Sequence, residues 1–112
     1  MNDDTTMMAM DILMHTGDAR SYCMKYLECV MNGDEQGAEE NLKKAEEENT
    51  LAHKTQTDAI QKAVSGEEFA YSLLLTHAQD WMMTVASEII IAKQMAAMYR
   101  NMNERLTKLE EK

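Results

Sequence analysis

A histidine and an aspartate, His77 and Asp80, interrupt the strongly apolar stretch LLLTHAQDWMMT at residues 73 to 84. Residues three apart on a helix lie on the same side of it, so this spacing brings an imidazole and a carboxylate together. The residue types allow three interpretations: a hydrogen-bonded structural histidine, a pair of metal ligands, or a histidine that acts as nucleophile or acid-base group. No third or fourth metal ligand is evident, and from the residues alone the three interpretations stay open.

The other residues that could do chemistry are two histidines and two cysteines. His15 in MHTGDAR and His53 in LAHKTQTD fall on different predicted helices, where structural roles are favoured, although three histidines on three helices could converge on a metal. Cys23 and Cys29 are six apart on one predicted helix, beyond disulfide reach and without a zinc-binding pattern, which predicts two reduced thiols. The sequence contains no nucleophile elbow, no HExxH motif and no glycine-rich phosphate loop, so the common hydrolase and nucleotide-binding signatures are absent.

The composition narrows the possible partners. The chain has 112 residues with 20 acidic and 11 basic side chains, a net charge of −9. This length predicts one domain, residues 1–112, and the charge argues against binding to nucleic acid or to anionic lipid. No apolar stretch is long enough to cross a membrane and the first six residues are polar and acidic, so we expect no membrane insertion and a cytoplasmic location.

The chain has no proline and four glycines, and its breaks are therefore few. Gly33 suits the left-handed end of a helix, and Asp34 can cap the next one. A second break is predicted in SGEEFAYS, residues 65–72, where Gly66 interrupts the pattern. The result is three helices at about 4–32, 35–64 and 70–110, without strands, in an all-α antiparallel up-down three-helix bundle.

Apolar spacing predicts how these helices pack. The expected core positions are Ile12, Ala19, Cys23, Tyr26, Leu27 and Val30 in the first helix and Ala38, Leu42, Ala45, Ala52, Ala59 and Ala63 in the second. The third helix is apolar nearly all round, which predicts a closed symmetric oligomer with this helix at its centre. The twelve methionines either fill irregular space in the core and the oligomer interface, which is the favoured interpretation, or form an adaptable docking surface.

Four short motifs together resemble a known family. They are GDARS at residues 17–21, AHKTQT at 52–57, SGEE and YS around the second break, and THAQDWMMT at 76–84. Their order and spacing resemble the enzyme IIA of the lactose/cellobiose class in the phosphoenolpyruvate-dependent sugar phosphotransferase system. The resemblance covers nearly the whole chain and implies a homotrimer of three-helix bundles, a nine-helix assembly with the third helices at the axis.

The resemblance also implies roles for individual residues. His77 would accept a phosphoryl group from the phosphohistidine of HPr and pass it to a cysteine of the cognate enzyme IIB. Asp80 would bind a divalent cation, Mg²⁺, shared by three subunits at the trimer axis as a structural ion. Gln79 could contact the phosphoryl group, although it points in a different direction from His77. The family commonly has a second histidine after the aspartate, and this chain has Trp81 there.

The expected function is therefore that of a phosphocarrier in the uptake and phosphorylation of a β-linked disaccharide. The alternative is a non-catalytic helical scaffold or adaptor that keeps the fold without phosphotransfer. A third possibility, a metalloenzyme with histidine ligands, would bind one transition metal per chain instead of one ion per trimer.

Overall fold

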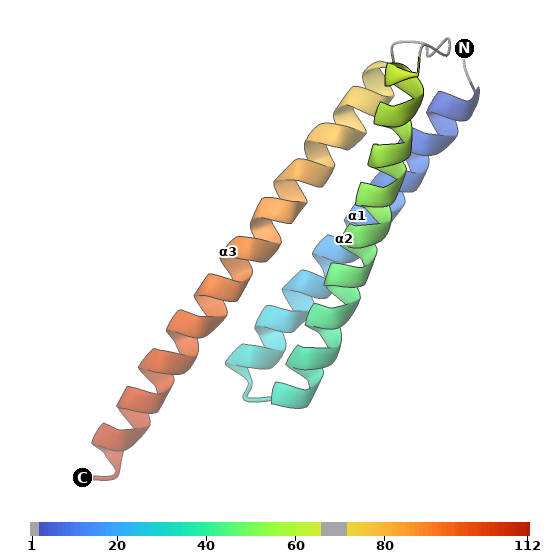
Figure 1. Cartoon of the computed structure of the whole chain (residues 1–112). Helices are drawn as coiled ribbons and strands as arrows, with labels where there is room; N and C mark the ends of the chain where they lie inside the picture. Colours follow the sequence, from blue (N-terminus) through green and yellow to red (C-terminus); the bar gives the residue numbers. More distant parts are fainter. Residues whose placement is uncertain (1–2, 66–71) are drawn as a thin grey trace.

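The computed structural model describes residues 3–65 and 72–112, and it contains three helices there and no strand. α1 spans Asp3–Met31, α2 spans Glu35–Val64 and α3 spans Leu73–Glu110. α1 and α2 form an antiparallel hairpin, and α3 runs back alongside it in the direction of α1 (Figure 1). The predicted up-down three-helix bundle is confirmed. No helix in these two ranges is long and apolar enough to cross a membrane.

The turn between α1 and α2 has the predicted chemistry. Gly33 adopts a positive φ of 76°, and it is a position where the left-handed backbone suits glycine. The next residue, Asp34, caps α2 by accepting a hydrogen bond from the Gly37 amide at 2.9 Å. The turn is closed by a bond of 2.8 Å from the Asp34 amide to the Cys29 carbonyl. Two residues therefore fix the hairpin.

The start of α3 lies slightly later than predicted. Ser72 has extended backbone and its hydroxyl accepts a hydrogen bond from the Leu75 amide at 3.1 Å, so the helix begins at Leu73 and not at residue 70. A serine side chain competes for the first free amides of a helix, which makes it a cap and not a helical residue. The predicted break at Gly66, and the rest of residues 66–71, lie outside the described residues.

The core is built mainly from small side chains. The predicted core positions of α1 and α2 are buried, except that Leu27 and Leu42 are half-buried and Ala63 is exposed. Ala63 lies four residues after Ala59, near the end of α2, where the small-residue stripe ends. The buried alanines of α2 recur every seven residues, which allows α1 and α2 to approach closely along their length. They are Ala38, Ala45, Ala52 and Ala59.

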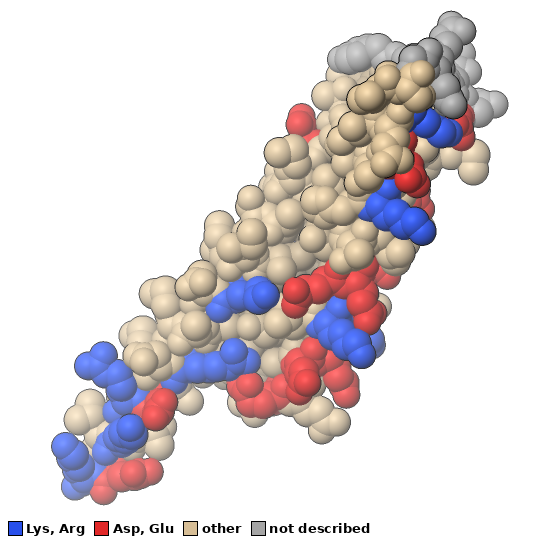
Figure 2. All heavy atoms as spheres, in the orientation of Figure 1, with Lys and Arg blue, Asp and Glu red and all other residues tan. Residues whose placement is uncertain are grey.

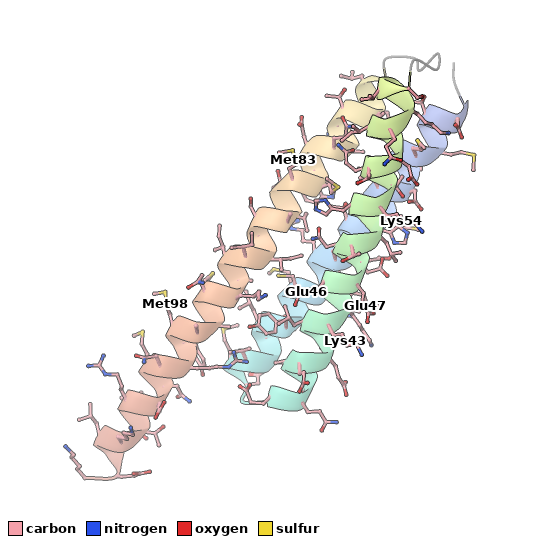
Figure 3. All side chains as sticks on the ribbon, viewed as in Figure 1. Lys43, Glu46, Glu47, Lys54, Met83 and Met98 are labelled. Carbon is pink, nitrogen blue, oxygen red and sulfur yellow. The ribbon has the colours of Figure 1, made fainter. Side chains whose placement is uncertain are left out.

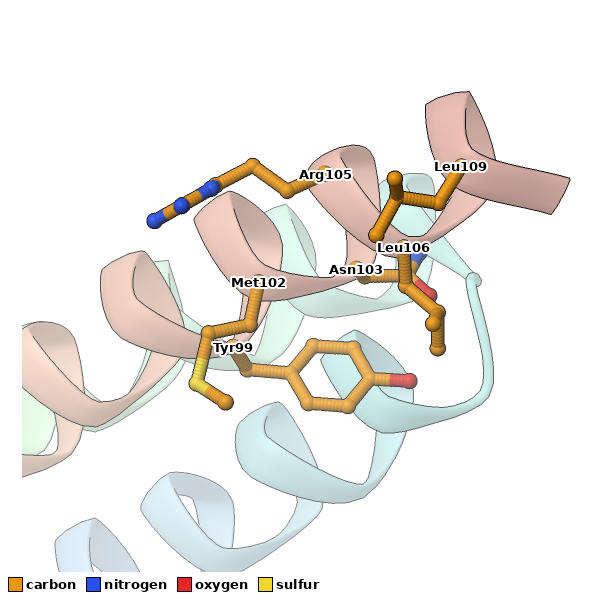
Figure 4. A pocket seen from close by; sticks show the side chains of 6 residues that line it. All are labelled: Tyr99, Met102, Asn103, Arg105, Leu106 and Leu109. Carbon is orange, nitrogen blue, oxygen red and sulfur yellow. The ribbon is translucent and has the colours of Figure 1, made fainter. Parts of the chain in front are cut away.

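α3 packs mainly against α1 and extends past the hairpin (Figure 1). Near the turn of the hairpin, the Tyr99 hydroxyl donates to the Met31 carbonyl at 2.9 Å, and Arg100 pairs with Glu35 at 2.8 Å. Beyond them, apolar side chains of the last turns line an open surface hollow (Figure 4). Its lining residues are Tyr99, Met102, Asn103, Arg105, Leu106 and Leu109.

Candidate functional site

His77 is exposed on the second turn of α3, which the Ser72 cap initiates. Among the described residues its ring has no hydrogen-bond or ion-pair partner. A structural histidine would have at least one such partner when packed in an apolar helix. The structural interpretation therefore finds no support within the chain, and the imidazole is available to react with a molecule from outside.

Asp80 is also exposed, and its carboxylate has no partner within the described part of the chain. Its backbone carbonyl accepts a hydrogen bond from the Thr84 hydroxyl at 3.0 Å, which is an ordinary helix contact. Three residues correspond to about 60° around the helix axis, so His77 and Asp80 occupy neighbouring sides of α3. The two side chains do not form an ion pair with each other.

Gln79 lies on a different side of α3 from His77. Two residues correspond to about 200° of rotation, so the Gln79 amide points nearly away from the imidazole. Its side chain is half-buried. Within one chain the structure therefore does not bring Gln79 to His77, in agreement with the difference in direction expected from the sequence.

The other two histidines behave differently from His77. His15 Nδ1 lies 2.5 Å from Glu48 Oε2 on α2, and its Nε2 lies 3.3 Å from Asp11 Oδ1, while Asp11 also accepts a hydrogen bond from Thr55. The hydrogen bond to Glu48 raises the pKa of His15, although partial burial lowers it. This imidazole joins α1 to α2, which is a structural role.

The three histidines do not converge on one site. His53 is exposed on α2, and within residues 3–65 and 72–112 no group of three or more histidine, cysteine, aspartate or glutamate side chains could hold a metal ion. A metal site built from a single chain is therefore not supported. A shared site remains compatible with Asp80, because each further copy of the chain would add another carboxylate.

α3 has an apolar face that neither α1 nor α2 covers. Leu73, Ile91 and Met98 lie on the same side as Asp80, because they are separated from it by nearly whole numbers of turns. These three side chains are 74%, 57% and 64% exposed, and the buried residues of α3 lie on the opposite side. We call Leu73, Asp80, Ile91 and Met98 the outer face.

The side of the molecule that carries the outer face has fewer charged side chains than the side formed by α2 (Figure 2). Met83 and Met98 point away from α1 and α2 (Figure 3), and the N-terminal half of α3 shows few charged side chains, whereas these gather over α2 and at the C-terminal end (Figure 2). An uncovered apolar helix face is typical of a site where another protein chain binds.

One cluster beside His77 was not predicted from the sequence. Trp81 lies one turn after His77, packs against the core and carries the Arg20 guanidinium over its ring, with 5.2 Å between Cζ and the ring centroid. Arg20 Nε also donates to Glu88 at 3.1 Å. Arg20 belongs to the GDARS motif, but only the packing of α1 on α3 brings it to Trp81. A surface hollow at this cluster is lined by Gly17, Arg20, Ser21, Met24 and Trp81.

Comparisons with known proteins agree in pointing to one family. The family model described as "PTS system, Lactose/Cellobiose specific IIA subunit" matches residues 7–100. The chain is 32% identical to the lichenan-specific phosphotransferase enzyme IIA component of Bacillus subtilis, over 93% of this chain and 94% of that protein. It is 34% identical to the oligo-beta-mannoside-specific EIIA component of the same organism, over 82% of this chain and 84% of that one.

A solved structure is similar over the same length. The crystal structure of the cellobiose-specific enzyme IIA from Bacillus anthracis superposes with a TM-score of 0.86 at 30% identity. The superposition covers 93% of this chain and 95% of that chain. The three-helix arrangement is therefore shared with a structure of the same family.

Proposed function

The chain belongs to the lactose/cellobiose-specific IIA family of the sugar phosphotransferase system, and we propose that it carries a phosphoryl group on His77 between HPr and its cognate enzyme IIB. It is a phosphotransferase component of sugar transport, as its relatives are. The proposed transport substrate is a β-linked disaccharide. The assignment to His77 depends on one observation: its imidazole is exposed, has no partner among the described residues, and lies beside an apolar face that α1 and α2 leave uncovered.

The chemistry of the proposed step is a direct exchange between two imidazoles. A neutral ring nitrogen of His77 attacks the phosphorus as the nitrogen-phosphorus bond in HPr breaks, and that electron pair returns to the ring of the donor. The phosphorylated donor ring reacts with its other nitrogen protonated and so leaves as neutral imidazole. Neutral His77, which keeps the proton on its own second nitrogen, becomes the phosphorylated, protonated ring. The thiolate of enzyme IIB then attacks the phosphorus carried by His77. A sulfur-phosphorus bond forms, the nitrogen-phosphorus bond breaks, and neutral His77 is restored. Neither step needs another covalent catalyst.

The surroundings of His77 suit this exchange. Both partner proteins must bring their reacting atom to the same nitrogen, so both need access to the same side of α3. The exposed ring of His77 lies beside the outer face and not on it, so this access stays open when the outer face is covered. We therefore propose overlapping contact surfaces for HPr and enzyme IIB around His77.

We further propose that the chain forms a homotrimer through the outer face of α3 and that Asp80 of each subunit holds a shared Mg²⁺. Three carboxylates that meet in an apolar interface repel each other, and a divalent cation offsets this repulsion with oxygen ligands of the kind it prefers. The residues fit such a group, since Asp80 is an exposed carboxylate on an otherwise apolar face. The ion would stabilise the assembly, and Gln79 would reach a phosphoryl group only on a neighbouring subunit.

Intact-mass measurement tests the assignment of His77. After incubation with phosphoenolpyruvate, enzyme I and HPr, the wild type is expected to gain one acid-labile phosphoryl group per chain, because His77 is the exposed histidine that lies beside the outer face of α3. His77→Gln is expected to gain none.

His53→Gln and His15→Gln serve as matched controls that remove a histidine elsewhere, and each is expected to be phosphorylated like the wild type. Labelling of His77→Gln at another residue would contradict the assignment. No gain in the wild type with partners shown to be active would favour the scaffold or adaptor.

A further inference from the structure

A phosphoryl group on His77 would add about two negative charges to an already acidic surface. The chain has a net charge of −9, and Asp80 lies one turn from His77. The sequence contains no lysine or arginine between Lys62 and Lys93. Any cation from the same chain that stabilises the phosphoryl group must therefore come from another helix.

α1 is the helix against which α3 mainly packs, and its two lysine or arginine residues are Arg20 and Lys25. Lys25 lies over the ring of Tyr22 on its own helix, with 5.4 Å between Nζ and the centroid. Arg20 instead contacts α3, through Glu88 and through the ring of Trp81. Of these two cations of α1, Arg20 is therefore the one that contacts α3.

Helix geometry places this charge on the side of α3 that carries His77. Trp81 and Glu88 follow His77 by four and eleven residues, which correspond to about 40° and 20° around the axis. Side chains on a helix lean toward its N-terminus, so the Trp81 ring leans toward the turn that contains His77. The guanidinium lies over this ring and bonds Glu88, so it is held on the side of α3 that carries His77, on the C-terminal side of that residue.

The Arg20 guanidinium has N–H groups that are available to a ligand. Its Nε donates to Glu88, but the two terminal nitrogens have no partner among the described residues, and half of the side chain is exposed. It lies at a surface hollow that Gly17 and Ser21 also line. A planar guanidinium with free N-H groups matches the oxygens of a phosphoryl group, which it can bind with two parallel hydrogen bonds.

We propose that Arg20 binds the phosphoryl group carried by His77 and that Trp81 is a positioning residue that holds the guanidinium beside it. The inference rests on the proposed function, since it concerns the phosphorylated state. It also gives a role to Trp81: the indole supports a cation supplied by α1.

The test compares Arg20→Gln and Arg20→Lys with the wild type, and Lys25→Gln is the matched control that removes the other α1 cation. Three quantities are measured: the rate of phosphorylation by phospho-HPr, the ³¹P chemical shift of the phosphohistidine, and its hydrolysis rate after the partners are removed. The ³¹P shift and the hydrolysis rate need no partner protein. Arg20 is half exposed, and circular dichroism checks that each variant folds.

Arg20→Gln is expected to slow phosphorylation about 10- to 100-fold, to move the ³¹P resonance and to change the hydrolysis rate, because one charge-assisted contact to the phosphoryl group is lost. Arg20→Lys keeps the positive charge but lacks the planar guanidinium. Its phosphorylation rate is expected to fall between those of the wild type and Arg20→Gln. Lys25→Gln is expected to match the wild type. Trp81→Ala is expected to shift the ³¹P resonance in the same direction as Arg20→Gln, and Trp81→Phe, which keeps an aromatic ring, to preserve it.

Two results would overturn the inference while leaving the proposed function intact. In one, Arg20→Gln is phosphorylated at the wild-type rate with an unchanged ³¹P resonance. In the other, transfer from HPr slows but the resonance and the hydrolysis rate stay the same, which would mean that Arg20 contacts the partner and not the phosphoryl group. A wild type that is never phosphorylated would overturn the proposed function itself.

Discussion

At the scale of single residues, the chain uses two histidines in opposite ways. His15 is held between Glu48 and Asp11, on two helices, whereas His77 is exposed and has no partner within the described residues. A ring whose nitrogens are both engaged with carboxylates is stabilised as the cation and cannot act as a nucleophile. A free ring keeps a lone pair available. Their partners, more than their sequence neighbours, distinguish the two imidazoles, and His77 is the one without a partner among the described residues.

The His15 contacts predict a pH dependence of stability. The pKa of His15 is raised in the folded protein above its usual value of 6.5, so folding favours the protonated ring. The stabilisation is then complete below about pH 6.5 and is lost as the pH rises through the raised pKa. His15→Gln is expected to lower the free energy of unfolding by roughly 1 kcal/mol at pH 6 and by less at pH 9.

Urea unfolding at the two pH values measures this difference. His53→Gln removes an exposed histidine from α2 and is the control, for which no such pH-dependent loss is expected. An equal loss for His15→Gln at pH 6 and pH 9 would show that the protonated ring does not stabilise the hairpin.

At the scale of the elements, each helix has a buried side with the same repeat. Buried residues alternate three and four apart along α1 and α3, and the alanines of α2 recur every seven residues. A repeat of 3.5 residues keeps one side of a helix against its neighbour along the whole length, as in coiled coils. Large apolar side chains of α3 that lie outside this buried side form a second apolar side, which is the outer face.

The hairpin between α1 and α2 depends on one backbone conformation. A Cβ added to Gly33 would meet nothing within 4 Å, so the strain in a variant comes from its positive φ of 76° alone. Gly33→Ala is therefore expected to lower the free energy of unfolding by about 1 kcal/mol. Gly33→Asn is expected to cost less, because asparagine tolerates the left-handed region better.

Urea denaturation at equal protein concentration distinguishes the two variants. If both variants lose the same free energy of unfolding, the backbone conformation at residue 33 is not the cause of the loss.

At the scale of the whole molecule, one chain leaves two long apolar strips uncovered. One is the outer face of α3, and the other consists of exposed methionines of α1 at spacings that keep them on one side. These are Met7, Met10, Met14, Met24 and Met31. Two different strips on one molecule allow each copy to contact two neighbours, which is the requirement for a closed ring. The proposed homotrimer would cover both kinds of surface.

Native mass spectrometry tests this assembly and its ion together. The wild type is expected to appear as three chains of 12.8 kDa with one divalent ion. Ile91→Glu places a charge on the outer face and is expected to give monomers without the ion, since three uncompensated carboxylates cannot be buried together. Removal of the metal with a chelator is expected to weaken the wild-type trimer.

Val64→Glu is the matched control. Val64 is 81% exposed at the end of α2 and does not belong to the outer face, so this variant is expected to remain a trimer. A trimeric Ile91→Glu protein, or a wild type with one ion per chain, would contradict the proposed arrangement.

The burial of the methionines differs from what the sequence predicted. They were expected to fill a core and an interface, but Met82 is buried, Met8 is half-buried and the other described methionines are exposed. The prediction is thus wrong for the core of the single chain, which is filled by alanines and by residues such as Ile12, Leu75 and Ile89. The expected role of the methionines in an oligomer interface stays a prediction. Ala63 was likewise assigned to the core and is exposed, since a periodic pattern does not say where packing ends.

The sequence by itself determined the features that depend on near neighbours along the chain. Gly33, Asp34 and the apolar repeat specify the hairpin and the helices, because capping, left-handed turns and helical periodicity act over a few residues. The quoted motifs were sufficient to predict the family. They also pointed to His77 and Asp80 as candidates, which remain proposals.

Only the tertiary structure decided which side chains meet across helices. His15 reaches Glu48 over 33 positions and Arg20 reaches Glu88 over 68, and neither contact has a local signal. Such contacts depend on the rotation and the vertical register of one helix against another, which the summed packing of the whole core sets. For the same reason the guanidinium that lies over Trp81 comes from Arg20 on α1, and only the packed bundle reveals this contact.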